Sequence, residues 1–208
     1  LGKTIEAGLV LAQYWAERRR KILLIVPASL RMQWRQELED KFYIDSILME
    51  SKEFNLQRKG GVRNPFEVPN KVVICSYDFA ARKASEIKAI NWDLVIMDEA
   101  HRLRNVYKTS NVTGNKLKES LRGRKKLLLT ATPLQNNLME LYGLVSIIDD
   151  HVFGDAKTFR EMYVAVRNTD IRNRNLQSRL QAFCQRTLRS QVTEYVRYTN
   201  RIALLQEY

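Results

Sequence analysis

Two adjacent carboxylates, Asp98 and Glu99, follow a run of four apolar residues, Leu94 to Met97. A short apolar run of this kind is typical of a strand that is buried on both faces. In an open α/β sheet, ligands bind at the carboxyl ends of the strands. One of two acids placed there could hold a metal ion while the other acts on water. Taken alone, the pair is also compatible with an acidic strand end that serves solubility.

The chain begins Leu1-Gly2-Lys3-Thr4, which is the end of the phosphate-loop pattern G-x-x-x-x-G-K-[ST]. A helix should follow over residues 5–18, because they contain no proline and place apolar residues at helical spacing, namely Ile5, Leu9, Ala12 and Ala16. Lys3 and Thr4 would then stand at a helix N-terminus, where backbone N–H groups and the helix dipole favour phosphate. The earlier glycine and the strand before it would lie upstream of residue 1. We therefore expect a gap or an exposed edge in the sheet.

A second buried strand is predicted over residues 22–26, and Ser29 could cap the helix that follows. This helix has an apolar ridge with a spacing of four, made of Leu30, Trp34, Leu38 and Phe42. We interpret Trp34 as a core residue of that ridge. Arg31 and Gln33 lie in the first turn, just past the strand's carboxyl end, where polar groups could contact a nucleic-acid phosphate.

Polar side chains also follow the strands predicted over residues 72–75 and 127–129. Ser76 and Tyr77 come after the first of these strands, and Thr130-Ala131-Thr132 after the second. Hydroxyls in such places can hydrogen-bond a neighbouring carboxylate or its bound water. Thr130 and Thr132 could instead cap the next helix, whose apolar ridge runs from Leu138 to Ile148.

The remaining elements complete an α/β pattern up to residue 149. We predict a short strand over residues 44–49, a basic surface loop over 51–70, a helix from Asp78 to about Ile90 and a helix over 110–121. No strand-like run remains after residue 149. We interpret residues 150–195 as a helical appendage and the tail to Tyr208 as a linker or strand.

The composition points to a basic globular protein. The net charge of +12 and the pI of about 9.8 favour a polyanionic partner such as nucleic acid, or else a solubilising surface. The only cysteines, Cys75 and Cys184, lack metal-ligand spacing and indicate a reducing compartment. No apolar run reaches transmembrane length, and we find no signal peptide, so no membrane partner is expected.

In order along the chain, these motifs resemble the first motor lobe of superfamily 2 helicases, and most closely the Swi/Snf-like family of DNA translocases. The series is Gly-Lys-Thr at 2–4, Ile-Val-Pro-Ala-Ser-Leu at 25–30 with Trp34, Ser-Tyr at 76–77, Asp-Glu-Ala-His at 98–101 and Leu-Thr-Ala-Thr-Pro-Leu-Gln-Asn at 129–136. Three details favour this family: Ser-Leu…Gln-Trp after Pro27, Arg-Leu-Arg-Asn after His101, and Pro-Leu-Gln-Asn-Asn after Thr132. Residues 185–189, Gln-Arg-Thr-Leu-Arg, are similar to that family's protrusion with a slight departure. The short protrusion resembles bacterial members.

The resemblance implies an α/β fold: a three-layer P-loop NTPase (RecA-like) lobe with a mainly parallel sheet over residues 1–149. Residues 150–208 would form an α-helical protrusion and the start of an inter-lobe linker. By this likeness, Gly2, Lys3 and Thr4 bind ATP, and Thr4 and Asp98 hold Mg²⁺. Glu99 would activate the attacking water, with Asp98 and Lys3 as the other catalytic residues.

The same resemblance implies residues that couple the nucleotide site to DNA, namely His101, Thr130, Ala131, Thr132 and Gln135. It places Arg31, Gln33, Ser76 and Tyr77 near the backbone of double-stranded DNA. A second RecA-like lobe, after residue 208, would supply arginine fingers worth on the order of a thousandfold in rate, so residues 1–208 alone should hydrolyse ATP negligibly.

Two other classes of function stay open on the sequence. The chain could belong to a catalytically silent nucleic-acid-binding scaffold, or to a true strand-separating DNA or RNA helicase. Flanking domains could add protein partners. The protein is expected in the cytoplasm, associated with the nucleoid, if its source is bacterial, and in the nucleus if eukaryotic.

Overall fold

The computed structural model describes residues 2–132, 137–166 and 169–184. Residues 2–166 belong to one compact unit, and residues 169–184 belong to a second. The helix α9 (Thr169–Leu180) is the one element of the second unit within the described residues. Gln135, the segment around it, and the predicted features from residue 185 onward lie outside these ranges.

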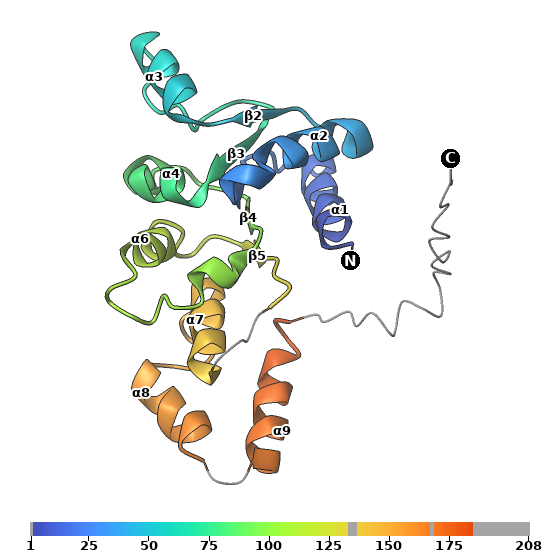
Figure 1. Cartoon of the computed structure of the whole chain (residues 1–208). Coiled ribbons are helices and arrows are strands. Elements are labelled where there is room, and N and C mark those ends of the chain that lie inside the picture. Colours follow the sequence, from blue (N-terminus) through green and yellow to red (C-terminus); the bar gives the residue numbers. More distant parts are fainter. Residues whose placement is uncertain (1, 133–136, 167–168, 185–208) are drawn as a thin grey trace, which may run out of the picture. The chain divides into compact units, whose positions relative to one another are not determined.

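A parallel sheet of five strands, in the order β2-β3-β1-β4-β5, forms the centre of the first unit (Figure 1). The strands are β1 (Ile22–Val26), β2 (Ser46–Leu48), β3 (Val72–Ser76), β4 (Leu94–Met97) and β5 (Lys126–Leu128). Leu24 in β1 lies opposite Ile74 in β3 and Ile96 in β4, so all three strands end at one edge of the sheet. Within the described ranges, the sheet is open, with β2 and β5 as its outer strands.

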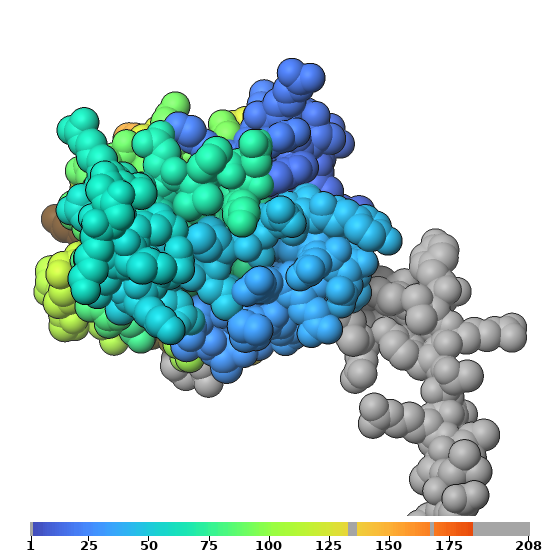
Figure 2. Space-filling view, turned by 90° about the horizontal axis from the view of Figure 1, so that it is seen from above, coloured from blue at the N-terminus to red at the C-terminus, as the bar shows by residue number. Residues whose placement is uncertain are grey.

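Helices cover both faces of the sheet, as expected for a three-layer fold. One hydrophobic cluster joins Leu24 and Ile74 of the sheet to Leu11 and Trp34, which belong to α1 (Lys3–Ala16) and α2 (Arg31–Phe42). These two helices contact each other and lie side by side in Figure 2, in dark and light blue. The helices of the opposite face are α3 (Ser51–Lys59), α4 (Tyr77–Arg82), α5 (Ala84–Lys88), α6 (Val112–Ser120) and α7 (Leu138–Ile148).

The segment after α7 packs back onto that helix through aromatic rings. Phe159 ends α8 (Ala156–Phe159), and its ring centroid lies 5.1 Å from that of Tyr142 in α7 and 5.0 Å from that of Phe153. Tyr163, in the π-helical turn Arg160–Val164, lies 4.9 Å from Phe159 by the same measure. The boundary predicted between residues 149 and 150 stays a prediction.

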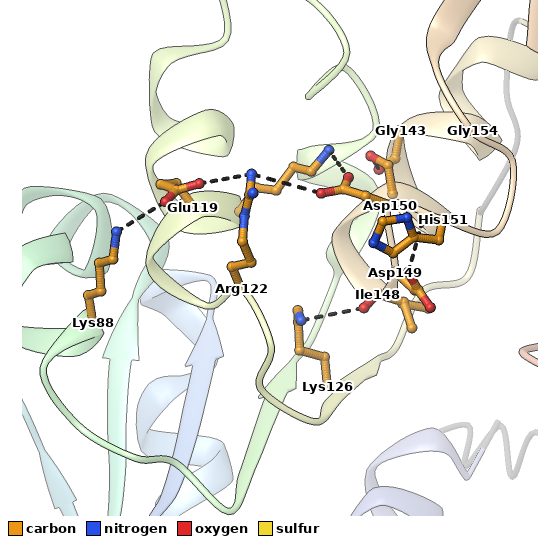
Figure 3. A network of polar contacts seen from close by, with 12 residues as sticks. Lys88, Glu119, Arg122, Lys126, Gly143, Ile148, Asp149, Asp150, His151 and Gly154 are labelled. Atoms are coloured by element: carbon orange, nitrogen blue, oxygen red, sulfur yellow. Dashed lines mark hydrogen bonds and ion pairs between the residues drawn. The ribbon is translucent and has the colours of Figure 1, made fainter. Parts of the chain in front are cut away.

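A network of charged side chains ties α6 to α5 and to the end of α7 (Figure 3). Glu119 lies 3.0 Å from Lys88 Nζ and 3.0 Å from Arg122 Nη2, and Arg122 also approaches Asp150 at 4.0 Å. These pairs are largely exposed, so solvent screens them and each should contribute little to stability. Beneath them, Lys126 Nζ donates to the Ile148 carbonyl at 3.4 Å, and burial lowers the pKa of this lysine.

The predictions for residues 51–59 and for the apolar face of the first helix are wrong. Residues 51–59 are helical, because the first helix-breaking glycine comes only at Gly60 and Phe54 is buried. The buried face of α1 consists of Ala7, Gly8 and Leu11 instead of the predicted ridge. Gly8 lies on this face because α1 packs closely against α2 there. A Cβ on Gly8 would lie 2.2 Å from the Phe42 ring.

Two predicted caps are also wrong. Ser76 caps α4 in place of Asp78, with its Oγ accepting from Phe79 N at 3.3 Å, and the helix breaks at Lys83 into α4 and α5. Ser29 belongs to the 3₁₀ turn Ala28–Leu30 and does not cap α2. Over the described ranges, no helix combines the length and the apolar character that a membrane span requires.

The buried thiol of Cys75 in β3 should make the stability of the fold fall at high pH. Burial raises the pKa of this thiol from 9.0 to about 12, and the charge of Arg31 opposes the shift. The unfolded chain therefore releases the thiol proton first as the pH rises. The stability contributed by this group is complete below pH 9 and falls by up to about 1.4 kcal/mol per pH unit above it.

Urea unfolding between pH 7.5 and 10.5 checks this prediction. We expect the free energy of unfolding to fall less steeply for Cys75→Ala than for the unaltered protein. Cys184→Ala is the matched control: this residue is exposed, although burial raises the pKa of its thiol as well, and because the large shift belongs to Cys75 this variant should keep a steeper fall than Cys75→Ala. Parallel curves for all three proteins would contradict the prediction.

Candidate functional site

Asp98 stands directly after β4, where its carboxylate is buried with 6% of the residue exposed. Oδ2 accepts a hydrogen bond from Trp34 Nε1 at 2.9 Å, and Oδ1 accepts one from the backbone N–H of Glu99 at 2.8 Å. The carbonyl of Asp98 accepts from the Tyr77 hydroxyl at 2.7 Å. Each carboxylate oxygen can accept more than one bond, so both keep capacity for an ion or a water molecule. The two hydrogen bonds therefore fix the orientation of the Asp98 side chain and leave its oxygens able to bind a ligand.

Glu99 turns its backbone into the left-handed region, with φ 52° and ψ 44°. This conformation costs a residue with a side chain about 1–2 kcal/mol. Oε1 of Glu99 lies 3.8 Å from Lys3 Nζ, and Oε2 lies 3.0 Å from His101 Nδ1, at an angle that does not suit a hydrogen bond. About 30% of each of these three side chains is exposed, so the contacts are weak enough to open for a ligand.

The N-terminus of α1 faces the same place, since Lys3 is its first residue. Gly2 precedes it with φ 83°, and a Cβ built on Gly2 would meet nothing within 4 Å. Among the described residues no side chain caps this helix, so its first N–H groups and the dipole remain available to an anion. The structure thus brings Lys3 close to Glu99 of the acidic pair, which lies 96 positions later in the chain (99 − 3).

The donor groups suit a nucleotide with its magnesium ion. Thr4 offers a hydroxyl and Asp98 a carboxylate, both hard oxygen ligands, and Mg²⁺ commonly takes one or two such groups and fills its other positions with phosphate and water. Lys3, whose Nζ lies 3.8 Å from Glu99, adds a positive charge for phosphate. The residues present therefore fit Mg-ATP.

The polar segment after β5 begins beside the acidic pair. Ala100 N donates to Leu129 O at 2.9 Å, and Leu129 N donates to Met97 O at 2.8 Å. Thr130 and Thr132 do not cap α7, because α7 begins at Leu138 and its N-cap residue is Asn137. Instead Thr130 Oγ1 accepts from Thr132 N at 3.2 Å, and Ala131 is exposed between them. The coupling roles of these residues and of His101 stay predictions.

Three of the four residues predicted to contact DNA lie at least partly at the surface, namely Arg31, Gln33 and Ser76. Gln33 is exposed on α2, and Arg31 forms an ion pair with Glu50 and donates through Nε to Ala28 O at 3.0 Å. Ser76 serves as the cap of α4.

Tyr77 is only 3% exposed, and burial raises the pKa of its hydroxyl above the ordinary range. Its hydroxyl holds the backbone of Asp98, which places it within the acidic site. Direct contact of Tyr77 with DNA stays a prediction that this enclosed position does not support.

Trp34 is the site residue that the sequence interpretation missed. It is 2% exposed and belongs to the apolar ridge of α2, as predicted, yet its N–H donates to the carboxylate of Asp98. A buried indole normally finds a hydrogen-bond partner, and this was the available signal. The sequence could not say which acceptor that partner would be.

An open parallel sheet with helices on both faces, and a lysine-bearing helix N-terminus beside an acidic pair at its carboxyl edge, defines a RecA-like nucleotide-binding lobe. The chain belongs to the SNF2-related family, since the family's SNF2-related domain matches residues 1–205. It is 37% identical over 172 residues to an uncharacterised ATP-dependent helicase, YqhH, of Bacillus subtilis (strain 168). That match covers 81% of this chain and 28% of the Bacillus protein.

Solved structures agree with the fold. The Sulfolobus solfataricus SWI2/SNF2 ATPase core in complex with double-stranded DNA superposes with a TM-score of 0.74 at 18% identity, covering 90% of this chain and 38% of that one. A second structure, the Sulfolobus solfataricus SWI2/SNF2 ATPase core domain, gives a TM-score of 0.67 at 16% identity, covering 89% and 37%. The predicted fold class and the predicted family are confirmed. The chain spans well under half of the length of each of these relatives.

Proposed function

We propose that this chain is the N-terminal ATP-binding lobe of a DNA-dependent ATPase that moves along double-stranded DNA. The observation that carries the proposal is the 3.8 Å approach of Lys3 Nζ to Glu99, beside the buried Asp98. It unites a phosphate-binding cation and two acids of different exposure in one place. Membership of the SNF2-related family supports the nucleotide as the substrate.

The two acids would have different roles because their surroundings differ. Asp98 is buried and held by two donors, which suits a fixed ligand to Mg²⁺ or to its water, together with the Thr4 hydroxyl. Glu99 is more exposed and lies near Lys3 and His101, which suits a base that takes a proton from the attacking water. When bound, Mg²⁺ neutralises the charge that develops on the phosphates.

Lys3 would leave Glu99 when a nucleotide enters. Its ammonium group would exchange the weak contact with Glu99 for a stronger one with phosphate oxygen. This exchange would free the Glu99 carboxylate at the moment the substrate arrives.

Double-stranded DNA is the proposed track. The net charge of +12 favours a polyanion, and Arg31 and Gln33 offer polar groups at the carboxyl edge of the sheet. One structural relative, the Sulfolobus ATPase core, is seen in complex with double-stranded DNA. Hydrolysis would change the closure of this lobe against a second one, and each cycle would advance the DNA.

An ATPase assay of the intact protein, with and without duplex DNA, tests the proposal. We expect turnover that depends on Mg²⁺ and rises when DNA is added, together with displacement of a triplex strand and no unwinding of a plain duplex. Residues 1–208 alone should show negligible turnover, since a missing arginine finger costs on the order of a thousandfold. DNA binding without turnover would indicate a silent scaffold, and strand separation would indicate a true helicase.

A further inference from the structure

The indole of Trp34 connects the surface of α2 to the interior of the acidic site. Its single N–H donates to Asp98 Oδ2 at 2.9 Å, and both residues are almost completely buried. An indole has one donor in a fixed direction, and a bond to a charged acceptor is among the stronger hydrogen bonds in proteins. The position of one oxygen of Asp98 therefore follows the position of this ring.

The same turn of α2 carries surface groups. Trp34 follows immediately after Gln33, which is exposed, and Arg31 begins the helix. Within one helical turn these residues move together, since intrahelical hydrogen bonds fix their relative positions. A contact that shifts the outside of this turn must therefore also shift the indole on its inside.

Asp98 has a second anchor that does not depend on α2. Its Oδ1 accepts from Glu99 N at 2.8 Å, and Tyr77 holds its carbonyl. Loss of the Trp34 bond would thus leave the carboxylate in place but freer to rotate about its side-chain torsion. Its orientation, and with it the Mg²⁺ ligand geometry, is the quantity that the indole controls.

We propose that Trp34 is a positioning residue through which DNA on α2 and nucleotide at Asp98 affect each other's binding. This inference rests on the proposed function and adds to it the residue that couples DNA binding to nucleotide binding. Such coupling is reciprocal: if DNA tightens nucleotide binding by some factor, the nucleotide tightens DNA binding by the same factor. The factor can be measured by binding alone, without turnover.

Two tryptophans in the chain form a matched pair for the test. Trp34→Phe keeps an aromatic ring and removes the N–H that serves Asp98. Trp92→Phe does the same to another buried indole, which is 5% exposed and donates to the Ile87 carbonyl at 3.0 Å. Trp92 precedes β4 and Asp98 follows it, so the control lies at the opposite end of that strand from the acidic site.

The experiment measures the dissociation constant of duplex DNA for the intact protein with and without Mg²⁺ and a non-hydrolysable ATP analogue. We expect the ratio of the two constants to fall at least about threefold toward one in Trp34→Phe and to stay unchanged in Trp92→Phe. A ratio preserved in Trp34→Phe, or lost equally in Trp92→Phe, would overturn the proposal. A ratio of one in the unaltered protein would overturn the coupling as such, while the DNA-stimulated ATPase assay judges the proposed function separately.

A second measurement needs no change at Trp34. In protein labelled with ¹⁵N at indole positions, the Trp34 resonance should shift when duplex DNA is added, and it should shift when nucleotide is added. The Trp92 resonance, assigned by its loss in Trp92→Phe, should stay in place. A Trp34 resonance that ignores DNA would overturn the proposal even if Trp34→Phe failed to fold.

Discussion

Replacing Glu99 by glutamine in the intact protein should lower ATP turnover by about a hundredfold to ten-thousandfold, the usual contribution of a general base. The amide keeps the size of the side chain but cannot take a proton from water. Binding of Mg-ATP should stay within a few-fold, because Asp98 and Lys3 remain and Glu99 only approaches Lys3 at 3.8 Å. Single-turnover hydrolysis and equilibrium binding of a fluorescent nucleotide measure the two quantities separately.

Two further variants sharpen this test. Glu119→Gln removes an acid that pairs with Lys88 and Arg122 away from the site, and it should leave turnover unchanged. Lys3→Ala should weaken nucleotide binding itself, which distinguishes a phosphate ligand from a base. Unchanged turnover in Glu99→Gln would remove Glu99 from the catalytic role, and a large loss of binding would make it a nucleotide ligand instead.

Replacing Gly143 by alanine should destabilise the lobe by about 1–3 kcal/mol, although alanine is the better helix former. Gly143 lies in α7, and a Cβ there would come within 2.1 Å of the Arg104 carbonyl oxygen and 3.3 Å of the Tyr107 ring. Because the nearer atom belongs to the backbone, a rotamer change cannot relieve the clash. Either α7 or the turn Ala100–Leu103, which ends just before Arg104 and contains His101, must move.

Urea unfolding measures this loss, and the ATPase activity should fall with it because the displaced turn follows Glu99. Gly60→Ala is the matched control, since its Cβ would meet Gln57 O at an ordinary 3.4 Å with no left-handed φ. We expect the control to change stability by about 0.5 kcal/mol at most in either direction. Equal stability of Gly143→Ala and the unaltered protein would show that α7 can move away at no cost.

The sequence predicts the elements that have sharp boundaries. The strands β1 and β4 occur over the predicted residues, 22–26 and 94–97, because continuous apolar runs end there at Pro27 and Asp98. Lys3 stands at a helix N-terminus and the acidic pair at a strand's carboxyl end, and both positions bind ligands in an open α/β sheet, so local patterns also predict their meeting. The helix α3 escaped prediction because its charged residues surround a single buried anchor, Phe54.

The network around Asp98 could not be predicted in the same way. Trp34 has the spacing of a core residue, and the sequence does not reveal that its acceptor lies 64 residues further along the chain. Tyr77 follows β3, which is separated from β4 by β1, so its reach to Asp98 depends on the order of the strands. Hydrogen bonds between distant elements depend on tertiary packing, which one-dimensional spacing does not contain.

The left-handed backbone of Glu99 sets a trade-off between folding and activity. Glycine would relieve a conformational cost of about 1–2 kcal/mol at this position, and asparagine would relieve part of it. A laboratory selection for heat resistance alone would therefore reward the loss of the very carboxylate on which hydrolysis is proposed to depend. Engineering of a more stable lobe should hold residue 99 fixed and seek its gains elsewhere.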